Sequence, residues 1–150
     1  VFLQNVVTDL LLGLETPDFF AAFADHVNDR YGVEAGFLTM NFPMLLPVLE
    51  KIGIRNPIIC TSINKIGFRM PGGLQVYEDL AAARRCRLIA MQTLAAGAIR
   101  PQEAMEYVCA MPGVDSILFG ASTKSHIDET KRMIDGFASP ATSSGGESGQ

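Results

Sequence analysis

The sequence has no tryptophan, few histidines and no long apolar run. A membrane-spanning helix needs about 20 consecutive apolar residues, and no stretch of the chain approaches that length. The first residues also lack the basic start of a secretory signal peptide. We therefore expect no membrane partner.

Cysteine is scarce as well, and its pattern excludes two common uses. Cys60, Cys86 and Cys109 are an odd number at wide spacings, without a CxxC pair. The two histidines, His26 and His126, lie far apart in the sequence, and no cysteine or histidine spacing fits zinc. The pattern predicts free buried thiols, a reducing cytoplasmic location and no metal site.

Charge and short motifs exclude further classes. The formal net charge of −4 disfavours a general nucleic-acid surface. The chain has neither a Walker loop nor a GxSxG motif, and "AAGAIR" is too short for a dinucleotide fingerprint. P-loop nucleotidases and serine hydrolases are therefore not expected.

The two ends differ from the rest of the chain. Residues 138–150 are rich in serine and glycine and carry one charge, which is typical of a disordered tail. We therefore predict one domain over residues 1–137. Because the chain begins at Val1 with an apolar run and no methionine, we also expect it to be a fragment that lacks upstream sequence.

Apolar runs of strand length alternate with amphipathic segments. The expected strands cover residues 1–5, 33–40, 57–63, 86–92 and 115–120. The expected helices cover residues 17–32, 42–53, 74–85 and 100–111, with a last one that begins between residues 122 and 125. Proline suits the first turn of a helix and glycine its end, and residues 17 and 32 fit those positions. Alternation of this kind predicts a parallel sheet with helical crossovers.

Two architectures fit this alternation: a doubly wound open sheet and a piece of a (β/α)8 barrel. A complete barrel usually needs about 250 residues, and this chain has room for five βα units. We predict the α/β class, as a partial TIM-like barrel of about five βα units.

Three stretches of residues 33–135 resemble the aldo/keto reductase family. They are "AGFLTMNFPMLLPVLEKIGI", "CRLIAMQTLAAGAI" and "GVDSILFGASTKSHIDET". They look like the family's fifth strand, its seventh strand with a small-residue loop, and its last strand with the cofactor helix. The resemblance implies an oxidoreductase that, when intact, reduces a carbonyl with NADP(H).

The resemblance also implies cofactor-binding residues. Asn41 would hydrogen-bond the nicotinamide carboxamide, and Ala96 and Gly97 would let the backbone approach the diphosphate. The turn before the last helix would hold the adenosine phosphate, with a lysine adding charge and a histidine near the adenosine; these residues are Gly120, Ala121, Ser122, Thr123, Lys124 and His126.

The departures from the family concern catalysis. The family's catalytic aspartate, tyrosine and lysine lie on early strands that this chain does not contain. Asn5 stands where the family has its active-site histidine, Cys60 to Ser62 offer no glutamine, and Thr130 replaces an asparagine. The catalytic residues are thus unknown, and the chain would carry only the nucleotide-binding half.

The residues allow other interpretations of the same segments. The turn at 120–123 has the features of an anion site at a helix N-terminus, but Ser122 or Thr123 could equally be a plain N-cap, and Ser125 with Asp128 resembles a capping box. The loop "GFRMPGG" could cover an anionic ligand with Arg69.

Two functional alternatives follow. Lys65, after a strand, could form a Schiff base in a class I aldolase-like lyase, or could be a solvated lysine. Alternatively the chain is a non-catalytic, incomplete barrel that pairs with a partner half or with itself. In either case we expect a nucleotide or a phosphorylated small molecule as ligand, rather than a nucleic acid.

Overall fold

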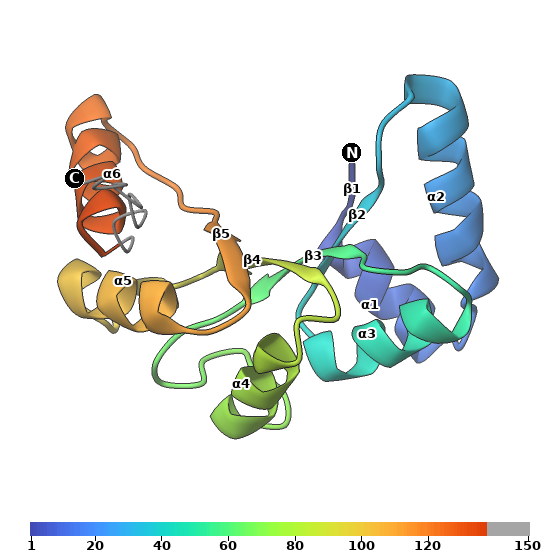
Figure 1. The fold of residues 1–150 in the computed structure, drawn as a ribbon, viewed down its shortest axis with the longest axis horizontal. Coiled ribbons are helices and arrows are strands. Elements are labelled where there is room, and N and C mark those ends of the chain that lie inside the picture. Colours follow the sequence, from blue (N-terminus) through green and yellow to red (C-terminus); the bar gives the residue numbers. More distant parts are fainter. Residues whose placement is uncertain (138–150) are drawn as a thin grey trace, which may run out of the picture.

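Five parallel strands form one sheet in the computed structural model, which describes residues 1–137 (Figure 1). The strands are β1 (Phe2–Leu3), β2 (Gly36–Thr39), β3 (Ile58–Ser62), β4 (Arg87–Met91) and β5 (Val114–Ile117). The helices are α1 (Asn5–Gly13), α2 (Asp18–Tyr31), α3 (Phe42–Lys51), α4 (Leu74–Ala82), α5 (Pro101–Ala110) and α6 (Lys124–Phe137). The predicted α/β class with parallel strands is confirmed. The predicted tail, 138–150, lies outside the described residues.

The strand order is the order of the chain, β1-β2-β3-β4-β5. A doubly wound sheet reverses direction once, and this sheet does not. Connections between parallel strands are right-handed. Because each new strand is added on the same side of the previous strand, every connection crosses the same face of the sheet. Figure 1 shows α1, α3, α4 and α5 along one side of the sheet, with α2 and α6 rising at its two ends.

The helix-covered face holds the main core. The register aligns Phe37 with Ile59 and Ile59 with Leu88, so these side chains share one face. All three are fully buried. Phe20 and Phe23 of α2 meet the Phe37 ring edge-on, at centroid distances of 5.9 and 6.0 Å. The N-terminal part of α2 is thereby fixed against β2.

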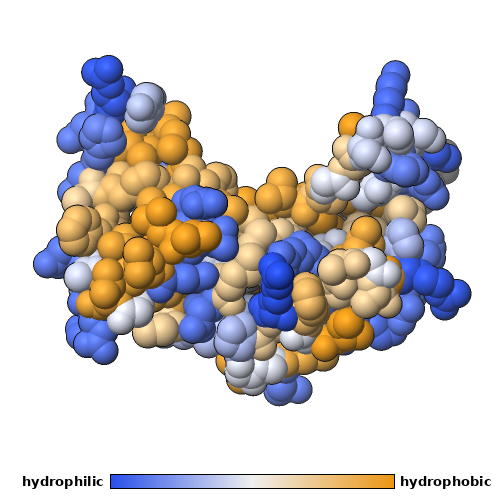
Figure 2. Space-filling view, turned by 180° about the vertical axis from the view of Figure 1, so that it is seen from behind, coloured by the Kyte–Doolittle hydropathy of each residue, from blue (hydrophilic) through white to orange (hydrophobic). Residues whose placement is uncertain are grey.

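The opposite face carries the alternate side chains of the same strands. Leu38, Cys60 and Ile89 are aligned across β2, β3 and β4 and alternate with the core residues. None of the helices drawn in Figure 1 lies over this face, and the space-filling view shows the molecule hollowed between its two limbs (Figure 2). At the two sheet edges, Phe2 is 44% exposed and Leu118 is 52% exposed.

The first element after β1 was mispredicted. We expected a strand over residues 1–5 followed by a loop, but Asn5 begins α1 and the strand is only two residues long. Apolar side chains occupy both the buried side of this segment, at Leu12, and its exposed side, at Val6 and Leu10. A short segment that is mostly apolar cannot be assigned from its periodicity alone.

The remaining helices end where their sequences indicate. Gly32 takes the left-handed conformation (φ 62°) that ends α2, and its N–H donates to the carbonyl of Asn28. Within residues 1–137, no helix has both the length and the apolar character to cross a membrane.

Gly113 connects α5 to β5 at a close backbone contact. A Cβ there would lie 1.9 Å from the carbonyl oxygen of Ala81, and φ is +90°. Gly53 has nearly the same φ, +88°, but a Cβ there would meet nothing within 4 Å. A comparison of alanine substitutions at the two glycines therefore separates the cost of the steric clash from the cost of the positive φ.

We predict that Gly113→Ala lowers the free energy of unfolding by at least about 3 kcal/mol, because backbone must move to admit the methyl group. Gly53→Ala should cost only about 1–2 kcal/mol, since it has the strain of positive φ alone. Urea unfolding of both variants measures the difference. Equal losses would contradict the close contact at Gly113.

Candidate functional site

The loops that follow β3, β4 and β5 enclose a cavity at the carboxyl end of the sheet. Parallel α/β sheets bind ligands at this end of their strands. The cavity measures about 350 Å³ and is called the mouth pocket here. Its lining residues are Phe68, Arg69, Gln92, Thr93, Leu94, Ala96, Leu118, Phe119 and Gly120.

A second cavity of about 320 Å³, the α6 pocket, adjoins the mouth pocket. The two share Thr93, Leu94, Phe119 and Gly120. The other lining residues come from α5, α6 and the turn between β5 and α6, and they are Pro101, Met105, Ala121, Ser122, His126, Glu129, Thr130 and Met133. The β5–α6 turn thus forms a wall common to both cavities.

Strained backbone gathers around the mouth pocket. Seven non-glycine residues within the described part of the chain have positive φ, and three of them line this pocket: Arg69 (54°), Gln92 (54°) and Ala96 (58°). Ala95, next to Ala96, is a fourth, with φ 47°. Left-handed conformations cost non-glycine residues free energy and are concentrated at functional sites. The strain marks the "QTLAAG" loop as a segment held in a specific shape.

Arg69 supplies the positive charge of the mouth pocket. Its guanidinium lies over the Phe68 ring, 5.3 Å from the centroid. Asn64, which is fully buried, fixes this loop with both atoms of its amide: Nδ2 donates to the Phe68 carbonyl at 2.9 Å, and Oδ1 accepts from the Phe68 N–H at 2.8 Å. The loop that carries the cation is therefore anchored to the end of β3.

The turn before α6 both caps the helix and lines the pockets. The Thr123 hydroxyl accepts the N–H of His126 at 3.3 Å, so Thr123 is the N-cap. The helix begins at Lys124, which places Ser125 inside it; the expected capping box of Ser125 with Asp128 is therefore wrong. Gly120, Ala121 and Ser122 are exposed, which leaves their backbone accessible from the cavities.

The structure gathers most, but not all, of the predicted cofactor residues. Ala96 and Gly120 line the mouth pocket, and Gly120, Ala121, Ser122 and His126 line the α6 pocket. Gly97 follows Ala96 in the short 3₁₀ turn Ala95–Gly97. Thr123 caps α6, and Lys124 is exposed and lines neither cavity.

Asn41 lies at the end of β2, away from both cavities. Its backbone N–H donates to the Thr39 hydroxyl at 2.8 Å, and its side-chain amide contacts only the Met44 sulfur, at 3.7 Å. Three strand spacings separate β2 from β5 in the sheet, or about 14 Å. A ligand that reached both Asn41 and Gly120 would have to extend across the carboxyl end of the sheet.

Asp9 of α1 closes the end of β2, and no local signal in the sequence points to this role. The Asp9 carboxylate accepts from the Thr39 hydroxyl at 2.5 Å and from the Met40 N–H at 3.0 Å. Close by, the Tyr77 hydroxyl donates to the Met40 carbonyl at 3.3 Å, and burial raises the pKa of Tyr77. These polar groups form hydrogen bonds with one another inside the fold.

Ser62 and Gln92 form a second polar pair on the open face of the sheet. The Ser62 hydroxyl, at the end of β3, donates to the Gln92 Oε1 at 2.9 Å, just past the end of β4. Gln92 also lines the mouth pocket. The neighbouring Thr61 hydroxyl is fully buried and has no hydrogen-bond partner, the one such atom found in the part of the chain that the structure describes.

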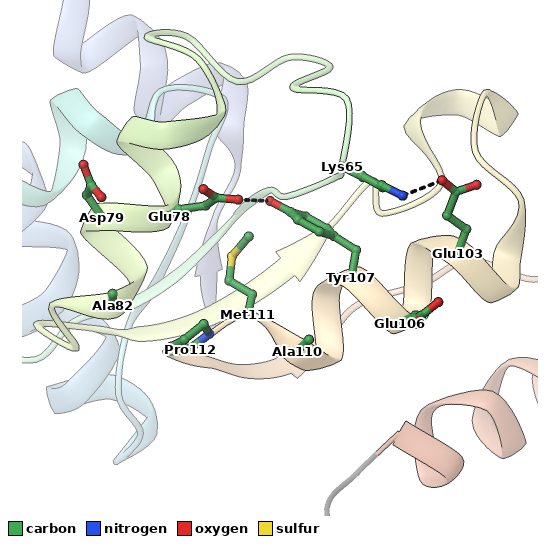
Figure 3. A pocket seen from close by; sticks show the side chains of 10 residues that line it. All are labelled: Lys65, Glu78, Asp79, Ala82, Glu103, Glu106, Tyr107, Ala110, Met111 and Pro112. Atoms are coloured by element: carbon green, nitrogen blue, oxygen red, sulfur yellow. Dashed lines mark hydrogen bonds and ion pairs between the residues drawn. The ribbon is translucent and has the colours of Figure 1, made fainter.

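Lys65 lies outside the mouth pocket. It borders a cavity of about 530 Å³ between α4 and α5, whose other walls carry Glu78, Asp79, Glu103, Glu106 and Tyr107 (Figure 3). Its ammonium donates to the Glu103 carboxylate at 2.7 Å, and this hydrogen bond lowers the pKa of Glu103. An ion-paired, half-exposed ammonium lacks the desolvated setting that activates a Schiff-base lysine. Its placement therefore favours the solvated-lysine interpretation.

The histidines and cysteines form no metal-binding cluster in the described part of the chain. His26 stacks edge-on with Tyr31 at 6.3 Å, and among residues 1–137 no three His, Cys, Asp or Glu side chains gather as a metal site. Burial raises the pKa of the Cys60 and Cys86 thiols to about 11. All three cysteines are free.

Comparisons with known proteins give no relative. No protein-family model, no curated protein and no solved structure matches the chain. The site must therefore be interpreted from its own geometry.

We predict that Asn64→Ala loosens the loop that carries Arg69. The substitution leaves the Phe68 N–H and carbonyl without their partners, which should lower the free energy of unfolding by about 2 kcal/mol. Amide hydrogen exchange in residues 64–70 should accelerate. Gln75→Ala is the control, because it removes a single exposed hydrogen bond to Asp79; an equal loss in both variants would contradict the anchoring role.

The thiols should react slowly in the folded chain. At pH 8 a thiol with a pKa near 11 is about one-thousandth ionised, whereas an ordinary cysteine is about one-quarter ionised. Labelling of Cys60 and Cys86 by a thiol reagent should be at least about 100-fold slower than in urea. Because the folded state favours the protonated thiol, stability should be complete below about pH 8.5 and decline as the pH rises toward 11. Rapid labelling at pH 8 would contradict the burial of both thiols.

Proposed function

We propose that the chain is the nucleotide-binding half of a (β/α)8-type barrel similar to the aldo/keto reductases, and that its mouth pocket and α6 pocket bind a dinucleotide such as NADP(H). The singly wound strand order supports the barrel, because successive βα units with all crossovers on one face are how such barrels are built. The uncovered opposite face would then be the interior of the barrel.

One observation carries the proposal. The resemblance assigned cofactor contacts to two loops separated by more than 20 residues, and the structure brings these loops together around adjoining cavities. Ala96 and Gly120 both line the mouth pocket. Both residues are exposed, and Arg69 supplies a cation at the same cavity. Exposed backbone beside a fixed cation suits a diphosphate.

The residues of the chain would bind and orient the cofactor. The β5–α6 turn offers small side chains that permit close approach, while Arg69 offers bidentate donors. Glu129 in the α6 pocket is negative, so the charged groups of a ligand are better accommodated by the mouth pocket. A bound NADP(H) would supply hydride, and the proton donor would have to come from a partner half.

The open sheet supports the related interpretation that the chain is an incomplete barrel. Within residues 1–137, β1 and β5 each have one strand neighbour, so both edges of the sheet present unpaired backbone groups. The hollow between the limbs is the face that further strands would enclose (Figure 2).

We predict that NADPH binds saturably to the full chain, measured by the change in its fluorescence on titration. Arg69→Ser should weaken binding by at least about 10-fold, because a charge-assisted pair to phosphate is worth about 1.5–3 kcal/mol. Arg55→Ser is the matched control: Arg55 is also exposed but precedes β3, at the opposite end of the strand. NADH titrated in parallel distinguishes the two cofactors.

Absence of binding by a folded, soluble chain would overturn the nucleotide proposal. Equal weakening by Arg55→Ser and Arg69→Ser would also overturn it, because the effect would then reflect general charge instead of the mouth pocket. Circular dichroism on each variant establishes that the chain is folded.

A further inference from the structure

Gln92 reaches the mouth pocket from a strained backbone position. The residue follows β4 directly, and its φ of 54° lies in the left-handed region. Glycine adopts this conformation without strain, whereas a residue with a side chain is destabilised there. A turn that served only to change the direction of the chain would favour glycine. The glutamine therefore indicates a role for its side chain.

A buried hydroxyl on the neighbouring strand fixes the orientation of the Gln92 amide. Ser62, at the end of β3, is fully buried, and its hydroxyl donates to Gln92 Oε1 at 2.9 Å. The Met40 sulfur lies 3.5 Å from the same hydroxyl. Because an amide is planar, a bond that holds its oxygen also sets the direction of its NH2 group. The acceptor of Gln92 is thus occupied inside the fold, and its two N–H donors remain.

Those donors are available to a ligand in the mouth pocket. Gln92 is half-buried and lines this cavity, and its NH2 group has no hydrogen-bond partner within residues 1–137. Arg69 lines the same cavity and likewise offers donors only. None of the described residues that line the mouth pocket is acidic or a histidine. The ligand group that fits these residues is an anion that accepts hydrogen bonds and donates none.

Phosphate fits this combination better than a carboxylate does. An arginine fork engages both oxygens of a carboxylate, whereas a phosphate held in the same way keeps further oxygens for a second donor. A diphosphate offers still more. Gln92 and Arg69 could therefore bond different oxygens of one phosphate group at the same time.

We propose that Gln92 is a specificity-determining residue of the mouth pocket, which donates to a phosphate oxygen of the ligand, and that Ser62 is its positioning residue. Ser62 does not line the cavity, so it acts on the ligand only through Gln92. The inference rests on the proposed function in one respect, that the mouth pocket binds a phosphate group. A dinucleotide and a free diphosphate share this chemistry.

Calorimetric titration of the full chain with inorganic pyrophosphate tests the role of Gln92. Gln92→Met keeps the length of the side chain without its donors, and it should weaken binding at least about 10-fold, the effect of losing one hydrogen bond to a charged group. Gln75→Met is the matched control, because Gln75 carries the same amide on the exposed surface of α4, outside the mouth pocket. It should leave the affinity unchanged. Equal weakening by both variants would overturn the proposal.

Ser62→Ala tests the positioning role. It should weaken pyrophosphate binding about 3-fold, since a freed amide must be ordered again when the ligand binds. In the Gln92→Met background the same substitution should have no further effect. A serine that only stabilises the fold would weaken binding equally in both backgrounds, and this result would overturn its positioning of Gln92.

A measurement on the wild-type chain does not depend on how well a variant folds. The side-chain NH2 signals of Gln92 in the NMR spectrum should shift when pyrophosphate is added, while those of Gln75 should not. Bound pyrophosphate that leaves the Gln92 signals unchanged would overturn the proposal.

The NADPH titration, run on the same samples, separates this inference from the proposed function. Pyrophosphate binding that requires Gln92, without any binding of NADPH, would support the phosphate donor and overturn the dinucleotide. NADPH binding that Gln92→Met leaves unchanged would support the nucleotide site and overturn Gln92 as a donor. Absence of pyrophosphate binding by a folded chain would overturn the inference as well.

Discussion

The handedness of the crossovers constrains the whole architecture. Each βα unit steps in the same direction across the sheet, so right-handed connections place the crossover helices on one face. That face receives the aromatic and aliphatic core around Phe37, Ile59 and Leu88. No helix among the described residues lies over the other face, and β1 and β5 are the edge strands of the sheet. The open face of the sheet and its two edges follow from this one-sided winding.

Short loops at the carboxyl end of the sheet are held by side chains that bond to backbone. Asp9 closes the end of β2, Asn64 fixes the loop after β3, and Thr123 caps α6. Each bond satisfies a backbone group that would otherwise be unpaired. The Asn64 and Thr123 bonds are local in the chain, whereas Asp9 reaches the backbone of Met40 from another element. The strained "QTLAAG" loop and the Gly120–Ser122 turn line adjoining cavities beside them.

The apolar side chains that the main core does not bury lie at particular places on the surface. Nearly half of the residues are apolar, and one side of a five-stranded sheet cannot bury them all. The remainder appears as the Phe2 and Leu118 side chains at the two sheet edges and as the outer face of α1. These surfaces lie outside the main core.

The sequence by itself determined the α/β class, the parallel strands and five of the six helices, because their periodicity and their proline and glycine boundaries are local signals. It also located the loops that carry Ala96 and Gly120. The tertiary structure alone decided that α1 is a helix, that Asp9 points inward to β2, and that Lys65 pairs with Glu103 between α4 and α5. Those outcomes depend on contacts between segments 30 or more residues apart, and pairings over such distances leave no periodic trace in the chain. The strand order likewise arises from how the βα units pack on one another. No local signal in the chain encodes it, so the open face of the sheet and its two edges are properties of the tertiary structure.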